Sequence, residues 1–503
     1  MTITVKGFKT QQKEVARTPP PFYYEFRVKK NYLMPKVLLV RTDSRSIPRV
    51  LSPPLGILYL ASALKSWGRH NFQVEVFDQR LFRKPFPALE RRLREFRPDL
   101  VGLSTLTFED AEMRETAGLV KKYLPTCPVI VGGPHGTIFY PEILTDKNID
   151  FVVVGEGEKS FVELADTLAE ERENVPPLKG VACRQDGQAA FPGEREPIAD
   201  LDSLPFPAWD LVDLDRYPRF ADFNGGLGKG RYMGIFTSRA CPYQCIYCHS
   251  VFGKGFRARS PENVVQEIDA LVSQYQVKEF QVFDDCFNLD RDRVIAIAKL
   301  IKDRNYGIRL SFTFGLRGDL LDPEVLTWLR KAGGYSLTIA VETASPRLQE
   351  MIGKNLDLKK VQAAIVNADR LGFLVKGLFM LGFPTETREE MEATARLARE
   401  LPLFNASFFT VVPFAKTPME EIFKIKYPGY NFNYQHHHYL LSKDRNPFYP
   451  GSGVNLRRFQ KSAHVKFYLF NPGRIIKTFL RAPNPWGYLV RNLLRGIRII
   501  FSY

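Results

Sequence analysis

Short apolar, β-branched runs alternate with segments of helical apolar spacing along most of the chain. From residue 36 to 183, runs of this kind predict buried parallel strands, and the segments between them, such as 55–67 and 86–96, predict helices. The strand-like runs are 37–40, 73–77, 100–104, 128–133 and 151–155. Strands and helices that alternate at this pitch predict an α/β domain with a doubly wound, Rossmann-like parallel sheet.

A proline-rich stretch at 184–226 interrupts this pattern, which then resumes to residue 425. The later strand-like runs are 233–237, 279–283, 309–313, 336–341, 375–380 and 406–412. Six β/α units predict a partial (β/α)6 barrel, because a full eight-unit barrel typically needs about 250 residues. The predicted divisions are an arm at 1–35, a first domain at 36–183, a linker at 184–226, the barrel at 227–425 and a small C-terminal region at 426–503.

The net charge of +16 is concentrated at the two ends of the chain. Residues 1–35 hold seven Lys/Arg and two Glu, and residues 451–503 hold ten Lys/Arg and no acid, which leaves the body at +1. A nearly neutral body argues against a nucleic-acid groove, which needs a basic stripe on the folded surface. Six cysteines, no signal-peptide pattern and no apolar run of about 18 residues predict a reduced, cytoplasmic protein.

Three cysteines, Cys241, Cys245 and Cys248, follow the first strand of the predicted barrel in the spacing Cys-x3-Cys-x2-Cys. Thiolates this close on one loop can bind a single metal centre. One alternative is a structural zinc site, but zinc requires a fourth ligand, and His249 is adjacent to Cys248 and therefore awkward in geometry. Three cysteines on a four-iron cluster leave one iron open for a substrate or cofactor.

The segment from Cys241 to Cys248, with Tyr247 before the last cysteine, resembles the radical S-adenosylmethionine (SAM) superfamily. The resemblance implies that the three cysteines hold a [4Fe–4S] cluster. It also implies that SAM chelates the open iron and is cleaved to methionine and a 5′-deoxyadenosyl radical, which abstracts hydrogen from a substrate. Further positions match the SAM-binding residues of that superfamily in order and spacing. They are Tyr247, Asp284, Asp285, Glu342 and Gly382.

The first domain, with the linker after it, resembles the N-terminal domain of cobalamin-binding radical SAM proteins. Polar and glycine residues follow its predicted strands, at the edge where such sheets bind ligands. The residues that the resemblance assigns to cobalamin are Ser104, Gly132, Gly133, Gly155 and Glu156. Glycine is also what a tight turn requires, so these turns alone are a weak signal. The Asp-x-His-x-x-Gly motif is absent. Many members of the subfamily that the domain resembles also lack it and hold cobalamin without a histidine below the cobalt; the alternative is a degenerate domain that no longer binds cobalamin.

Residues 489–503 predict an amphipathic helix with apolar residues on one face and Arg491, Arg495 and Arg498 on the other. Such a helix suits either peripheral contact with an anionic membrane or packing on the barrel. The three histidines at 436–438 precede this tail, and their consecutive positions do not favour a metal site.

Together these patterns predict a cobalamin-dependent radical SAM enzyme that methylates an unactivated carbon of a small or lipid-like substrate. An electron donor such as flavodoxin or ferredoxin would supply the electron, and no nucleic-acid partner is expected. One alternative keeps the same cofactors but catalyses cyclisation, rearrangement or oxidation without methyl transfer. A more distant alternative is a zinc-stabilised basic nucleic-acid-binding protein.

Overall fold

The computed structural model describes residues 34–43, 51–172, 174–219, 227–228, 230–249, 251–429 and 454–490. The predictions for the N-terminal arm up to Leu33, for the histidines at 436–438 and for the tail beyond Val490 therefore lie outside the described residues.

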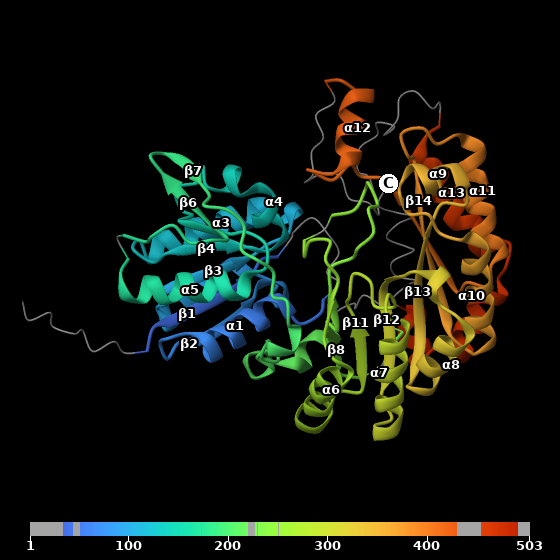
Figure 1. Ribbon diagram of the computed structural model, residues 1–503, viewed down its shortest axis with the longest axis horizontal. Coiled ribbons are helices and arrows are strands. Elements are labelled where there is room, and N and C mark those ends of the chain that lie inside the picture. Colours follow the sequence, from blue (N-terminus) through green and yellow to red (C-terminus); the bar gives the residue numbers. More distant parts are fainter. Residues whose placement is uncertain are drawn as a thin grey trace, which may run out of the picture. The chain divides into compact units, whose positions relative to one another are not determined.

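The first domain is a seven-stranded sheet in the order β2-β1-β3-β4-β5-β6-β7, in which the first five strands are parallel (Figure 1). Its strands are β1 (Lys36–Arg41), β2 (Gln73–Asp78), β3 (Leu100–Ser104), β4 (Val129–Gly132), β5 (Phe151–Val153), β6 (Val181–Gln185) and β7 (Gln188–Ala190). Its helices are α1 (Leu55–Trp67), α2 (Pro85–Phe96), α3 (Asp110–Tyr123), α4 (Gly133–Ile143) and α5 (Gly157–Glu170). Helices α2, α3 and α4 bury apolar side chains against one face, and α1 and α5 against the other, so the predicted doubly wound fold is confirmed.

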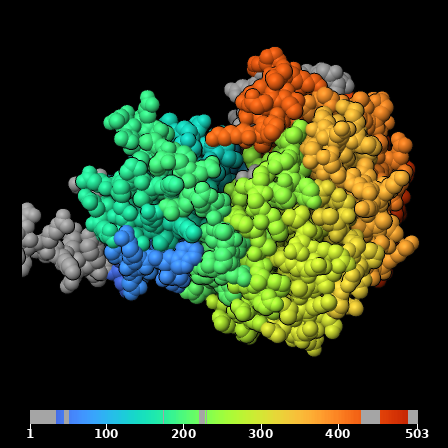
Figure 2. Space-filling view, viewed as in Figure 1, coloured from blue at the N-terminus to red at the C-terminus, as the bar shows by residue number. Residues whose placement is uncertain are grey.

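Strands β6 and β7 extend the sheet into the segment predicted as linker. They form an antiparallel hairpin around Asp186 and Gly187, whose φ angles of 50° and 80° are those of a tight turn. The linker beyond them forms short 3-10 turns, and Leu204 and Trp209 are buried in the same apolar core as the barrel. In the space-filling view the green linker surface continues into the yellow-green surface of the barrel (Figure 2).

The second domain is a six-stranded parallel sheet in the order β8-β11-β12-β13-β14-β15, which confirms the predicted partial (β/α)6 barrel. Its strands are β8 (Tyr232–Ile235), β11 (Glu279–Val282), β12 (Arg309–Leu316), β13 (Gly334–Glu342), β14 (Leu374–Leu381) and β15 (Asn405–Thr410). Its helices are α6 (Pro261–Tyr275), α7 (Arg291–Arg304), α8 (Pro323–Lys331), α9 (Pro346–Met351), α10 (Leu358–Arg370) and α11 (Arg388–Glu400). The helices α12 (Pro418–Lys426), α13 (Leu456–Leu469) and α14 (Gly473–Arg481) follow the barrel.

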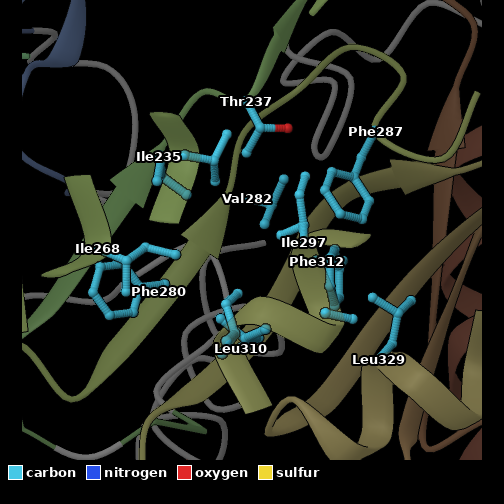
Figure 3. A pocket seen from close by; sticks show the side chains of 13 residues that line it. Ile235, Thr237, Ile268, Phe280, Val282, Phe287, Ile297, Leu310, Phe312 and Leu329 are labelled. Carbon is cyan, nitrogen blue, oxygen red and sulfur yellow. The ribbon is translucent and has the colours of Figure 1, made fainter. Parts of the chain in front are cut away.

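The space between the barrel strands and helices α6 to α8 is filled by apolar side chains (Figure 3). Phe280 and Phe312 come from the sheet, Ile268 and Leu329 come from the helices, and Thr237 is the one polar residue of the lining. This lining has no charged or metal-binding group, so it is helix-to-sheet packing and not a ligand site.

Candidate cofactor sites

The loop that carries the three cysteines leaves the carboxyl end of β8 and is closed by a short strand pair. Strand β9 (Ser238–Arg239) pairs antiparallel with β10 (Arg257–Ala258), so residues 240–256 form one excursion above the barrel. Ala240 has a φ of 70°, a left-handed conformation that is uncommon for a residue with a side chain. The backbone therefore turns sharply just before Cys241.

The three thiols share this loop but differ in their surroundings. A hydrogen bond with Cys286 is the main cause that lowers the pKa of Cys241. Burial raises the pKa of Cys245, and desolvation together with the charges of Cys245 and Cys241 raises the pKa of Cys248 to about 11. The thiolates thus destabilise one another, and a cationic centre bound among them would remove that penalty.

Within the described ranges, no three Cys, His, Asp or Glu side chains converge as ligands of a single metal ion. The donor set itself, three thiols within eight residues of one loop, fits an iron–sulfur cluster.

Two of the residues predicted to bind SAM are in contact. The hydroxyl of Tyr247 donates to Oε1 of Glu342 at 3.2 Å, and the Lys354 ammonium donates to the same oxygen at 2.7 Å. Glu342 ends strand β13 with a φ of 66°, a strained conformation of the kind that is concentrated at functional sites. Lys354, buried beside it, is a member of this site that the sequence motifs did not reveal.

The Asp pair after β11 fixes the chain at the entrance to the cysteine loop. Asp284 is buried, and its carboxylate accepts hydrogen bonds from the Thr237 backbone at 2.6 Å and from the Ser238 hydroxyl at 2.6 Å. Burial raises the pKa of Asp284. The exposed neighbour Asp285 accepts a hydrogen bond from the backbone of Ala240. Asp284 therefore holds strand β9, while Asp285 lies at the open side.

Gly382 forms the turn after β14 and has a φ of 88°. Its backbone N–H donates to the buried carboxylate of Glu386 at 2.5 Å, and the Phe383 N–H donates to the same oxygen at 3.1 Å. Burial is the main cause that raises the pKa of Glu386 to about 8. The Phe383 ring lies 6.2 Å from that of Tyr247, so this turn adjoins the cysteine loop.

Three of the residues assigned to cobalamin meet at the carboxyl edge of the first sheet. Thr105 donates through its N–H to the Gly132 carbonyl at 3.2 Å, which joins the ends of β3 and β4. Gly133 has a φ of 87°, and a Cβ there would lie 3.0 Å from the Thr105 carbonyl and 3.3 Å from the Ser104 hydroxyl. A side chain at this position would meet the end of β3, so glycine allows the ends of β3 and β4 to approach closely at the edge where such sheets bind ligands.

Gly155 and Glu156 follow β5, and they have different surroundings. Gly155 has a φ of 80° and donates to the Thr137 hydroxyl at 3.0 Å. The Glu156 carboxylate is directed to the barrel, where it forms ion pairs with Arg257 and, at 3.3 Å, with Arg239. Its oxygens are thus engaged by cations next to the cysteine loop.

A second glutamate strengthens this junction. Glu158, in the first turn of α5, accepts from Arg239 at 2.5 Å, and both side chains are buried. Arg239 and Arg257 belong to the strand pair that closes the cysteine loop, whereas both glutamates follow β5. Since ligands of such sheets lie past the carboxyl ends of the strands, these ion pairs join the two predicted cofactor regions directly.

Two family models match the chain. The B12 binding domain matches residues 49–165, and the radical SAM superfamily matches residues 235–398. These ranges correspond to the doubly wound sheet and to the partial barrel.

Curated relatives share this similarity over most of their length. An uncharacterized methyltransferase of Pyrococcus horikoshii is 31% identical over 474 residues, which cover 93% of this chain and 98% of the relative. Cytidylyl-2-hydroxyethylphosphonate methyltransferase of Streptomyces wedmorensis is 29% identical and covers 76% and 79% of the two chains. Anaerobic magnesium-protoporphyrin IX monomethyl ester cyclase of Rubrivivax gelatinosus is 26% identical and covers 76% and 69%.

The fold resembles that of a solved radical SAM methyltransferase, TsrM from Kitasatospora setae. The TM-score is 0.64 at 22% identity, and the match covers 78% of this chain and 76% of that one. At this identity the likeness shows a common fold.

The chain belongs to the radical SAM enzymes that carry an N-terminal B12-binding domain. Its cofactors are those of the two matched families, a [4Fe–4S] cluster, SAM and cobalamin, as the sequence predicted. No helix among the described residues is long and apolar enough to cross a membrane.

Proposed function

We propose that this enzyme transfers a methyl group from SAM to a carbon atom of a small-molecule substrate, with cobalamin as the methyl carrier. The observation that carries the proposal is the near full-length similarity to a methyltransferase with 31% identity. The second candidate is a radical reaction without methyl transfer, because one of the relatives is a cyclase.

Cys241, Cys245 and Cys248 are proposed as the cluster ligands, and the cluster would supply the electron that cleaves SAM. The Tyr247–Glu342–Lys354 group, at the end of β13, would hold the polar part of SAM. Glu342 presents one oxygen to both partners and keeps a second oxygen for a donor on the ligand. The turn at Gly382 would support SAM from the neighbouring strand.

Ser104, Gly132, Gly133 and Gly155 are proposed to contact cobalamin through the carboxyl edge of the first sheet. Glu156, which the sequence also assigned to cobalamin, is better explained as a residue that positions the cysteine loop, because Arg239 and Arg257 engage its carboxylate. Asp284 is similarly better explained as a support of β9, whereas Asp285 remains open to SAM.

Anaerobic purification, reconstitution with iron, sulfide and cobalamin, and incubation with SAM and dithionite test the proposal, because the bound cobalamin accepts the methyl group and leaves S-adenosylhomocysteine. We expect iron–sulfur absorbance and two products of SAM, 5′-deoxyadenosine and S-adenosylhomocysteine. 5′-Deoxyadenosine without S-adenosylhomocysteine would favour the second candidate. Cys245→Ala should abolish the absorbance, and Cys127→Ala, a buried thiol of the first domain, should not.

Two partners are also proposed, an electron donor and a membrane surface. A reduced flavodoxin or ferredoxin would supply the electron in place of dithionite, and the rate of 5′-deoxyadenosine formation with either protein tests this. The tail at 489–503 is proposed to make peripheral contact with a membrane, on the basis of its amphipathic pattern. Loss of sedimentation with anionic vesicles after deletion of 489–503 would support that role.

A further inference from the structure

Helix α14 packs on the barrel through polar side chains and exposes its apolar ones. Arg474 and Thr478 are buried, with 4% and 3% of their surface exposed. Ile475, Ile476 and Leu480, in contrast, are exposed at 49%, 64% and 78%. This is the reverse of an ordinary surface helix, which buries its apolar stripe and exposes its polar one.

The polar contacts fix α14 firmly at one end of the barrel. The Arg474 guanidinium donates to the carbonyls of Leu403 at 3.1 Å and Leu401 at 3.3 Å, just before β15. Lys477 and Arg481 both form ion pairs with Asp369, just before β14. These segments precede their strands, so α14 lies at the amino end of the barrel, opposite to the cysteine loop at the carboxyl end.

The segments on either side of α14 in the chain also expose apolar side chains. The Phe479 and Trp486 rings are in edge contact at 5.0 Å, and Leu469 and Phe470 extend the surface at the end of α13. We call this surface the α14 patch. Its members, exposed at 49% or more, are Leu469, Phe470, Ile475, Ile476, Leu480 and Trp486. Exposed apolar side chains gathered on one short stretch of the chain mark an interaction site.

The side chains around the patch are mainly cationic, which favours an anionic partner. Residues 454–490 contain seven Lys/Arg and no Asp or Glu, and Lys461 and Lys466 on α13 are exposed. The nearby carboxylate of Asp369 is already paired with Lys477 and Arg481. A second copy of the chain would bring the same cations together, which is unfavourable, whereas an anionic lipid surface accepts apolar, aromatic and cationic side chains at once.

We propose that the α14 patch binds the surface of an anionic lipid bilayer and that the cofactor end of the barrel faces away from it. The apolar side chains enter the boundary between headgroups and acyl chains, with Trp486 at the headgroup level. This proposal does not rest on the proposed function, and it concerns residues other than the tail at 489–503. It implies that a substrate reaches the cofactors from the aqueous side.

Sedimentation of the full-length protein with vesicles tests the proposal. The vesicles contain phosphatidylcholine alone, or phosphatidylcholine with an equal amount of phosphatidylglycerol. The test variant is the double substitution Ile476→Glu and Leu480→Glu, which leaves the tail intact. The control is Ile425→Glu on α12, where the side chain is equally exposed at 81%. Thermal melting verifies that each variant is folded.

We expect binding to the anionic vesicles that weakens with added salt and falls more than about tenfold in the double variant. The control should bind like the unaltered protein. Equal binding by the double variant would overturn the proposal and assign binding to another segment, such as the tail. A lack of binding by the unaltered protein, or a patch-dependent dimer that does not bind vesicles, would also overturn it.

Discussion

The ion pair between Arg239 and Glu158 makes a quantitative prediction, because it joins the two domains in a buried setting. The side chains are only 5% and 7% exposed, and the contact distance is 2.5 Å. Replacing Glu158 by Gln leaves the guanidinium buried without its closest counter-charge. Removing one partner of a buried pair typically costs about 3–5 kcal/mol. Glu156 still faces Arg239 at 3.3 Å, so we expect a loss near the lower limit, about 3 kcal/mol.

A second ion pair that crosses between domain and linker provides the matched control. Lys65 and Asp210 are 3.0 Å apart, but their side chains are 40% and 58% exposed. Exposed pairs of this kind contribute about 0–1 kcal/mol, because solvent screens the charges. Asp210→Asn should therefore leave the stability nearly unchanged.

Urea unfolding followed by tryptophan fluorescence measures both effects, since Trp209 is buried next to the junction. If Glu158→Gln shifts the unfolding free energy no more than Asp210→Asn does, the junction is not the buried charge pair inferred here. The double variant Arg239→Met with Glu158→Gln should lose less than the sum of the single variants, because no buried charge is then left unpaired.

Three further predictions concern the cofactor region. The pKa of Glu386 is raised to about 8, so this side chain binds its proton more tightly in the folded than in the unfolded state. Its contribution to the free energy of unfolding is therefore complete at low pH and is lost as the pH rises toward about 8. Glu386→Gln should flatten the fall of the thermal midpoint between about pH 5 and pH 8. Gly353→Ala places a Cβ 2.9 Å from the Gln244 carbonyl in the cysteine loop, at a φ of 67°, and should lower both the midpoint and the iron content after reconstitution. Gly307→Ala is the control, because Gly307 has a similar φ of 63° but no atom lies within 4 Å of an added Cβ. This variant has the backbone strain without the steric contact, and it should leave the iron content unchanged. Lys354→Met leaves Glu342 buried without its cation, and should weaken SAM binding in equilibrium dialysis by about tenfold or more. If the affinity for SAM is unchanged, the Glu342–Lys354 pair is not part of the SAM site.

Much of the fold was predictable because both domains are built from buried parallel strands. Runs such as Val37–Val40 are apolar on both faces of the strand. This local pattern identifies them as buried strands even when the strands that pair with them are not known. Strand β7 was missed because Gln188–Ala190 is short and largely exposed, although the Asp186-Gly187 pair before it is a recognisable turn signal. The apolar contacts of the linker were also missed, since prolines indicate loops but not the core into which Leu204 and Trp209 pack.

The candidate site was predictable where it depends on local spacing and not where it depends on pairing across the chain. The cysteine spacing and the glycine turns are local, and the structure places the cysteine loop and Glu342 at the same end of the barrel. Lys354 becomes part of this site only because the loop after α9 returns to Glu342, which no spacing rule reveals. Glu156 was assigned to cobalamin because it follows a strand, yet its partners Arg239 and Arg257 lie 83 and 101 residues further along the chain.

The ion pairs of Glu156 and Glu158 with the two arginines lie between the carboxyl ends of the strands of the two domains. This position explains how two ligand-binding domains can take part in one reaction. A doubly wound sheet and a barrel each bind ligands past the carboxyl ends of their strands, so two such domains cooperate only if those ends adjoin. Glu156 and Glu158 follow β5, Arg239 and Arg257 enclose the cysteine loop, and the charges of the two pairs neutralise one another in a buried setting. If the domains separated, all four charged side chains would be exposed and solvated by water. If the domains packed together in any other orientation, some of these charges would be buried without a partner. The junction therefore selects one relative arrangement of the cofactor regions. The proposed methyl transfer would require such a fixed arrangement, because the distance between donor and acceptor must be reproduced in every turnover.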